Sequence, residues 1–357
     1  MSLQFIRLAL LVATVAAAGS ASAHSLDITR LPLGDDNVSD EAKVGYLWAC
    51  RTDPTAGGAH VDGPWIDTAN GTWNLEEKVS VSGSVTWSHA LTVGLEGDQR
   101  VFSTNDLPNH PTGIFPIDRN EEAYKYDRNP NRIAEQDFAF DLPANPVLLD
   151  QPTCAPGAVG ILLSGVVLFN AVDAPGRDAV AHETQDDCQG HPQEGSVYHY
   201  HNVSRCVLEA LDSGTGQSKL VGYAVDGFGI YGPRDENGEE LSSADLDACH
   251  GRVSEVEWDG KMVEMYHYVA TLDFPYTVGC MRGAYANDDV MTISGPRLQQ
   301  EMAGPNGRQP DLRAAAEKLG ISESALVGAL GAPPPDFSAA AAKLGITEAA
   351  LTAALGL

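Results

Sequence analysis

The sequence is short of basic side chains: 22 lysines and arginines stand against 49 aspartates and glutamates, giving a formal net charge of −27. A surface this negative repels nucleic acid and anionic membranes, so neither is expected as a partner. The chain also lacks a phosphate-binding glycine loop, a dinucleotide fingerprint and the Gly-x-Ser-x-Gly elbow of serine hydrolases. These absences exclude several classes of protein without naming one.

Long apolar runs are scarce as well, and Leu8–Ala18 is the one that stands out. It follows Arg7 and leads to Ala21-Ser22-Ala23, the pattern that signal peptidase cleaves. The run is shorter than the roughly 20 residues that a membrane-spanning helix needs. We therefore expect residues 1–23 to be a signal peptide, and the remainder to be a soluble periplasmic or extracellular protein without a membrane span.

Cleavage at that site would place His24 at the N-terminus. Its α-amino group and imidazole could then chelate one metal ion together, since both groups bind metals near neutral pH. This geometry resembles the copper histidine brace of copper-dependent polysaccharide monooxygenases, and His24 is a candidate for a second metal site. The alternative, which we favour, is a mobile terminus without a ligand role.

Cysteine occurs six times and never in a Cys-x-x-Cys spacing, which argues against a thiolate zinc site or a thioredoxin-like redox centre. An even number of cysteines in an oxidising compartment predicts three disulfides. The spacing alone permits many pairings of these residues, which are Cys50, Cys154, Cys188, Cys206, Cys249 and Cys280.

The segment from about Tyr46 to Tyr285 is rich in Gly, Pro, Asn and Asp and has few long helical patterns. It predicts one mainly β (β-rich α+β), disulfide-stapled domain over residues 24–300. Apolar residues alternate from Val79 to Leu95, which predicts a half-buried strand or two strands across a kink, with His89 as a hydrogen-bonded core histidine. The apolar run from Val159 to Phe169 predicts a central strand or hairpin.

Residues 301–357 differ in character and contain a 25-residue repeat that begins at Asp311 and again at Asp336. In each unit Asp caps a first helix, Gly ends it, and Ser or Thr caps a second helix. The outline is that of a DNA-binding helix-turn-helix, but export and the scarcity of basic residues exclude that interpretation. We expect a small α-helical tail for attachment to a protein or cell-surface partner that the sequence does not identify.

The segment Tyr198-His199-Tyr200-His201 carries the clearest chemical signal. Alternate residues of a strand point the same way, so His199 and His201 share one face and the two tyrosines share the other. Two imidazoles on one face form a two-point grip for a transition metal such as copper or zinc. A Cys188–Cys206 bridge would hold the preceding loop beside this strand and bring His191 into the same site.

A second, degenerate copy follows. Asp247–Gly251 echoes the loop before the motif, and Tyr266–Val269 echoes the motif itself, with Val269 in place of the last histidine. This copy supplies His250 and His267, and two halves facing each other would pool their histidines in one site. The repeat also pairs Cys249 with Cys280, which leaves Cys50 for Cys154 by elimination.

These motifs resemble the YHYH domain family of mainly bacterial secreted proteins, over roughly residues 46–285. The resemblance extends to four further stretches: Asn105–Gly113, Tyr126–Asn131, Gly176–Glu183 and Gly222–Gly232. It implies no established activity. Relatives in this family often repeat Tyr-His-Tyr-His in the second half and have another histidine where this chain has Arg252, so the resemblance does not support a metal role for the second half.

Two other patterns are weaker. His182-Glu183 is half of a zinc-protease helix motif, but no second histidine follows at the required spacing, so we assign it no catalytic role. Asp235, Asn237 and Glu239 could offer oxygens to calcium, although an Asn-Gly turn between strands explains the segment equally well.

The sequence thus predicts an exported protein that binds a transition metal through a histidine cluster. A metal-free structural or adhesion module is the alternative. A metal-dependent hydrolase or copper oxidase comes third, because no catalytic residue can be assigned from spacing.

Overall fold

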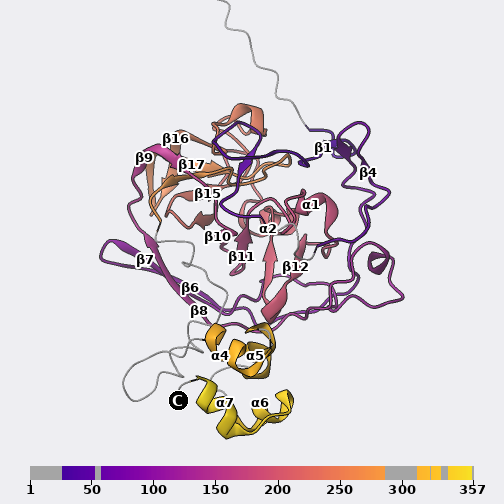
Figure 1. Ribbon diagram of the computed structural model, residues 1–357. Coiled ribbons are helices and arrows are strands. Elements are labelled where there is room, and N and C mark those ends of the chain that lie inside the picture. Colours follow the sequence, from indigo (N-terminus) through magenta and orange to yellow (C-terminus); the bar gives the residue numbers. More distant parts are fainter. Residues whose placement is uncertain (1–25, 53–57, 286–311, 322, 331–336, 356–357) are drawn as a thin grey trace, which may run out of the picture.

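The computed structural model describes residues 26–52, 58–285, 312–321, 323–330 and 337–355. At its centre is an eight-stranded mixed sheet with the strand order β12-β13-β11-β10-β14-β15-β17-β16 (Figure 1). The strands are β10 (Ala158–Leu162), β11 (Val167–Phe169), β12 (Gly190–Pro192), β13 (Tyr198–Tyr200), β14 (Leu220–Ala224), β15 (Gly229–Tyr231), β16 (Gly251–Trp258) and β17 (Lys261–Val269). The protein is mainly β, which confirms the fold class expected from its composition.

The central sheet consists of two four-stranded halves with the same connectivity. Each half has an antiparallel hairpin (β10–β11 or β14–β15), a parallel pair (β11–β13 or β15–β17) and a closing antiparallel pair (β12–β13 or β16–β17). The halves join where β10 pairs antiparallel with β14, so an approximate two-fold rotation relates them. Their outer strands consequently lie at opposite edges of the sheet.

Glycine in the left-handed conformation turns the hairpin in each half. Gly165 has φ +85° between β10 and β11, and Gly227 has φ +89° between β14 and β15. A side chain at either position would be strained, since L-residues rarely adopt such angles. The apolar run from Val159 to Phe169 is therefore a central hairpin, one of the two forms that the sequence predicts.

Smaller sheets and short helices surround this core. One three-stranded sheet contains β1 (Leu31–Pro32), β5 (Thr72–Trp73) and β4 (Ile66–Asp67), and another contains β6 (Leu91–Glu96), β7 (Gln99–Thr104) and β8 (Phe138–Pro143). Two strand pairs are β2 (Val38–Ser39) with β3 (Leu47–Trp48), and β9 (Leu148–Thr153) with β18 (Met281–Gly283). The short helices are η1 (Ala123–Lys125), α1 (Ala179–His182), η2 (Glu194–Ser196), α2 (Arg205–Leu211) and η3 (Ser243–Asp245).

The alternating segment from Val79 to Leu95 is not the strand that its pattern predicts. Val81 and Val85 form only isolated bridges, and the regular strand β6 begins at Leu91. Val93 and Leu95 are 38 % and 55 % exposed, because β6 lies at the edge of its three-stranded sheet. His89 is half-buried and its Nδ1 donates to the carbonyl of Leu107 at 2.8 Å, as a hydrogen-bonded structural histidine does.

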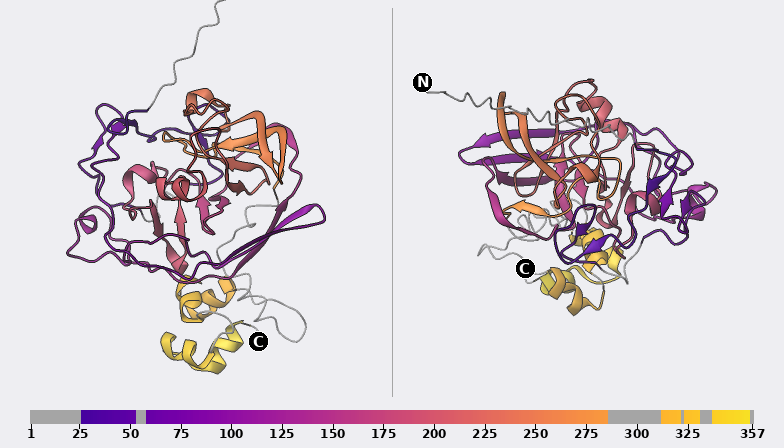
Figure 2. Two further views of the ribbon diagram at one scale, coloured as in Figure 1. Left: turned by 180° about the vertical axis from the view of Figure 1, so that it is seen from behind. Right: turned by 90° about the horizontal axis from the view of Figure 1, so that it is seen from above.

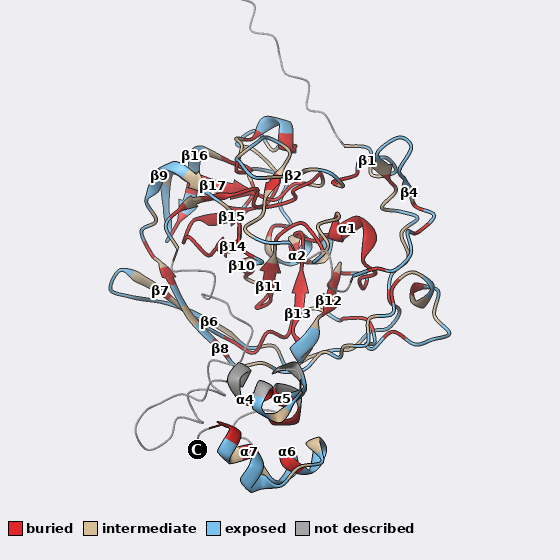
Figure 3. Ribbon diagram, viewed as in Figure 1, coloured by how far each residue is buried: buried red, intermediate tan, exposed pale blue. Residues whose placement is uncertain are grey.

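The tyrosines of the two motif strands form part of the main core, and Figure 3 shows the strands around them as largely buried. Tyr198, Tyr200 and Tyr268 have no exposed surface. The hydroxyl of Tyr198 donates to Asp186 at 2.8 Å and that of Tyr268 donates to Asp226 at 2.6 Å, which satisfies these buried polar groups. The intervening histidines point to the opposite face of the sheet.

Three disulfides tie the β-rich body together: Cys50–Cys154, Cys188–Cys206 and Cys249–Cys280. These are the pairings that the sequence repeat and elimination predict. The second and third close equivalent loops in the two halves. Among the residues that the structure describes, no helix combines the length and apolarity needed to cross a membrane.

The tail contains four described helices: α4 (Leu312–Leu319), α5 (Glu323–Leu330), α6 (Phe337–Leu344) and α7 (Glu348–Leu355). They lie together at one side of the β-rich body (Figure 2). Their apolar side chains, including Leu326, Leu330 and Leu351, form a cluster of their own. The domain boundaries at residues 300 and 301 lie outside the described residues and remain a prediction.

Removal of the tail is expected to leave the β-rich body almost equally stable. The tail buries its apolar side chains mainly within itself, so its loss should expose little of the main core. Calorimetry of a chain that ends at Gly304 should therefore show nearly the same melting temperature as the full chain. A fall of many degrees would reveal that α5 contributes substantial stability through its contact with η2.

Candidate metal centre

Two adjacent strands bring three predicted histidines together. His191 on β12 lies directly opposite His199 on antiparallel β13, and His201 follows β13 by one residue. The turn before β12 is held by Asp186, whose Oδ1 accepts the backbone N–H groups of Cys188 and Gly190 at 2.9 and 3.2 Å. The Cys188–Cys206 bridge closes the same loop, as the sequence predicts.

The three imidazoles converge closely enough to share one ion. His191, His199 and His201 each offer a ring nitrogen within 4.8 Å of the other two. All three residues are at most 4 % exposed. The ring of Phe169 lies against His199, with a centroid separation of 4.3 Å, and shields the cluster from one side.

Backbone carbonyls orient two of these rings. The Nδ1–H group of His201 donates to the carbonyl of Asn170 at 2.6 Å, and that of His199 lies 3.5 Å from the carbonyl of Val197. A carbonyl oxygen can only accept a hydrogen bond. In both rings the proton is therefore on Nδ1, and Nε2 has a free electron pair. Such a second hydrogen bond is the usual device that fixes the tautomer of a metal-binding histidine.

Burial lowers the pKa of two of the imidazoles. Loss of solvation lowers the pKa of His191 well below its ordinary value, and the neighbouring His199 and His201 lower it further. Burial likewise lowers the pKa of His199, with His201 adding to the effect. Metals bind neutral imidazole, so burial favours the binding-competent form of His191 and His199.

Glu183 also reaches this cluster, although the sequence analysis assigned it no role. Its Oε2 lies 3.3 Å from Nε2 of His191 and 3.3 Å from Nε2 of His201. Within the described structure, Oε2 and both ring nitrogens of His191 are buried without a hydrogen-bond partner. In the sequence, Glu183 stands out only as part of the dipeptide His182-Glu183. Its position beside the histidines does not depend on the helix spacing of zinc proteases, so that motif could not predict it.

The structure does not bring His267 and His250 to this cluster. The strand order places β17 five steps from β13, which corresponds to about 24 Å across the sheet. The two-fold relation between the halves sends the histidines to opposite edges, so the expected pooling does not occur.

In the second half, other residues occupy the equivalent positions. Arg252 pairs with His267 in the register that His191 and His199 share, and Val269 stands where the first half has His201. His250 corresponds to Gln189 rather than to a histidine of the cluster, and both adopt positive φ, +69° and +58°. His250 Nε2 lies 3.0 Å from the hydroxyl of Thr271.

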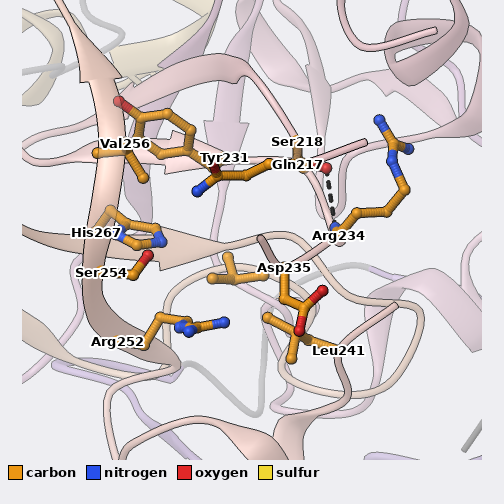
Figure 4. A pocket seen from close by; sticks show the side chains of 12 residues that line it. Gln217, Ser218, Tyr231, Arg234, Asp235, Leu241, Arg252, Ser254, Val256 and His267 are labelled. Atoms are coloured by element: carbon orange, nitrogen blue, oxygen red, sulfur yellow. Dashed lines mark hydrogen bonds between the residues drawn. The ribbon is translucent and has the colours of Figure 1, made fainter. Parts of the chain in front are cut away.

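A small pocket marks the corresponding place in the second half (Figure 4). His267 and Arg252 line it together with Tyr231, Asp235 and Ser254. The guanidinium of Arg252 pairs with Glu236 at 3.0 Å, and burial lowers the pKa of His267 to about 4. A fixed cation therefore stands where the first half has His191, and only one imidazole remains.

The predicted calcium ligands form a turn. Asp235 Oδ1 accepts the backbone N–H groups of Asn237 and Glu239 at 2.8 and 2.9 Å. Asp173 makes the same contact with the N–H group of Arg177 in the first half, at 2.7 Å. The turn thus belongs to the repeated framework, while calcium binding there remains a prediction. His24 and the signal peptide lie outside the described residues.

Comparison with known proteins identifies one family. A family model described as YHYH protein matches residues 139–240. The match contains the predicted histidines His191, His199 and His201, and Glu183 as well. Neither the search of curated proteins nor the search of solved structures found a match.

Proposed function

The chain carries a YHYH domain, and we propose that this domain binds one transition metal ion, zinc or copper, through His191, His199 and His201. The observation that carries the proposal is the convergence of three buried imidazoles on one point. Unpaired polar groups in a protein interior are costly, and a bound metal ion would give one nitrogen of each imidazole a partner. Without an ion, the ring nitrogens of His191 have no partner among the described residues.

The burial of the cluster supports a binding role rather than catalysis. Catalytic zinc sites keep an open coordination position for water or substrate, whereas structural sites are closed. Here each histidine is at most 4 % exposed and Phe169 covers His199. A substrate would have to displace protein to reach the ion. We therefore propose a buried metal that stabilises or is carried by the protein.

The three disulfides support a periplasmic or extracellular location, since such bonds persist in oxidising compartments. The N-terminal signal pattern agrees with this proposal. A metal-free structural or adhesion module is the competing function, and it would leave the same fold with an empty cluster.

Elemental analysis distinguishes the two functions. Protein purified from the periplasm of its native host should contain zinc or copper near one equivalent per chain. Replacement of His199 and His201 together by Ala should abolish the bound metal, because His191 alone would be left of the three imidazole ligands. The matched control is His267→Ala, which removes the equivalent strand histidine of the second half and should leave the metal content unchanged. Wild-type protein that remains metal-free after exposure to zinc and copper would favour the structural module.

A further inference from the structure

Glu183 is held against the histidine cluster by the docking of helix α1. Asp178 caps this helix by accepting the N–H group of Ala181 at 3.2 Å. The same carboxylate accepts the hydroxyl of Tyr276 at 2.7 Å and the N–H group of Gly34 at 2.9 Å. Glu183 directly follows the last residue of α1, so these contacts fix the position of its side chain beside the histidines.

The distances around Glu183 fit a metal site better than hydrogen bonds. Its Oε2 lies 3.3 Å from each of two ring nitrogens, whereas N–H···O bonds centre near 2.9–3.0 Å. In a tetrahedral zinc site with bonds of about 2.0–2.1 Å, two ligand atoms are separated by about 3.3 Å. Toward His191 and His201, the carboxylate oxygen therefore stands at the spacing that two ligands of one tetrahedral ion have.

The negative charge of Glu183 and of the neighbouring carboxylates also favours a bound cation. The residue is 9 % exposed, and its Oε2 has no hydrogen-bond partner in the part of the chain that the structure describes. Burial raises the pKa values of Asp127 and Asp173, and the negative charge of Glu183 raises them further. The buried amine of Lys78 donates instead to the carbonyl of Val180 and to Gln185. Lys78 thus acts on Glu183 only through its electrostatic field, and a buried carboxylate whose Oε2 lacks a hydrogen bond is costly.

We infer that Glu183 is the fourth ligand of the proposed site, completing a closed shell of three imidazole nitrogens and one carboxylate oxygen. This inference rests on the proposed function. Such a shell suits Zn²⁺ and similar divalent ions that accept four ligands. It disfavours Cu⁺, which prefers thiolate and thioether sulfur, and Ca²⁺, which takes six to eight oxygens. Cu²⁺ prefers square-planar or tetragonal geometry, so zinc is the expected occupant of a tetrahedral shell.

The test compares the full-length protein with Glu183→Gln, which keeps the shape of the side chain and removes its charge. Zn²⁺ affinity is measured by competition with a chromophoric chelator. The variant should bind Zn²⁺ more than about 100-fold more weakly, since even outer contacts of a metal site contribute about 10–100-fold. Glu209→Gln, at a glutamate on the exposed face of α2, is the control and should bind as the wild type does.

A second measurement separates a ligand from a structural residue. If Glu183 is a metal ligand, the metal-free protein lacks the cation that balances its charge. Removal of that charge should then leave the melting temperature of the metal-free protein unchanged or raise it. A sharp fall in that temperature would show that Glu183 supports the imidazoles directly, and would overturn the inference. Equal zinc affinity in Glu183→Gln and wild type would also overturn it, while the histidine site would stand. Failure of the wild type to bind zinc or copper would instead remove the proposed function.

Discussion

If the proposed site is filled in the wild-type protein, removal of the metal is expected to lower its melting temperature by about 8–16 °C. An ion present at about 1,000 times its dissociation constant stabilises the folded state by about 4 kcal/mol. Each kcal/mol shifts the transition of a domain of this size by about 2–4 °C. In the proposed site the ion would also neutralise the charge of Glu183, and its loss would leave Oε2 of Glu183 and the ring nitrogens of His191 without hydrogen-bond partners. Calorimetry with excess zinc and with excess chelator measures the difference.

The same measurement on the variant in which Ala replaces both His199 and His201 serves as the control. This variant should melt at one temperature whether zinc or chelator is present. The protein must be equilibrated with chelator under conditions that open the fold, since the buried cluster should release its ion slowly. Wild-type protein with identical transitions in zinc and chelator would contradict a stabilising ion.

His250→Gln is expected to make the protein less sensitive to acid. Burial lowers the pKa of His250 to about 3, whereas an unfolded histidine titrates near 6.5. As the pH falls below about 6.5, His250 becomes protonated in the unfolded state but not in the folded state. The free energy of unfolding therefore decreases until about pH 3. At about pH 4 this loss amounts to about 3 kcal/mol in the wild type and is absent in the variant.

Glutamine is the natural choice because Gln189 occupies the equivalent left-handed position in the first half. The hydroxyl of Thr271 donates to Asp273, so its oxygen accepts from His250 Nε2, and a glutamine amide can donate there as well. Denaturant unfolding of both proteins at about pH 7 and about pH 4 gives the comparison. Buried carboxyls with raised pKa values, such as Asp178 and Asp186, affect both proteins alike and cancel. A stability difference that does not change with pH would be the contrary result.

Local pattern and internal repetition predicted much of this structure. Alternation in Tyr198–His201 correctly separates the buried tyrosines from the converging histidines, because side-chain direction in a strand follows residue parity. The repeated spacing of cysteines around each motif predicts the two loop-closing disulfides. Both inferences depend on short-range geometry, which a single sequence records.

Long-range arrangement was harder to predict. Two repeats can stack face to face or extend one sheet, and the spacing of His250 and His267 is compatible with either. The β10–β14 pairing decides for the extended sheet and separates the histidines. The role of Glu183 could not be predicted because its position depends on long-range contacts of Asp178. The hydrogen-bond partners of Asp178, Tyr276 and Gly34, lie 98 and 144 residues away in the chain. Val79–Leu95 alternates in sequence, but β6 belongs to a small, exposed sheet.

The two-fold sheet provides a reference within the same molecule. β13 and β17 have equivalent neighbours, and the hydroxyls of Tyr198 and Tyr266 each donate to the aspartate of their loop, Asp186 and Asp247. Of these two strands, only β13 belongs to the half in which the histidines converge. The amide exchange rates of the two strands can therefore be compared within one sample, where pH, temperature and global unfolding are identical. If metal binding slows amide exchange in β13 more than in β17, the stabilising effect of the ion lies in the first half of the sheet. This comparison needs no substitution.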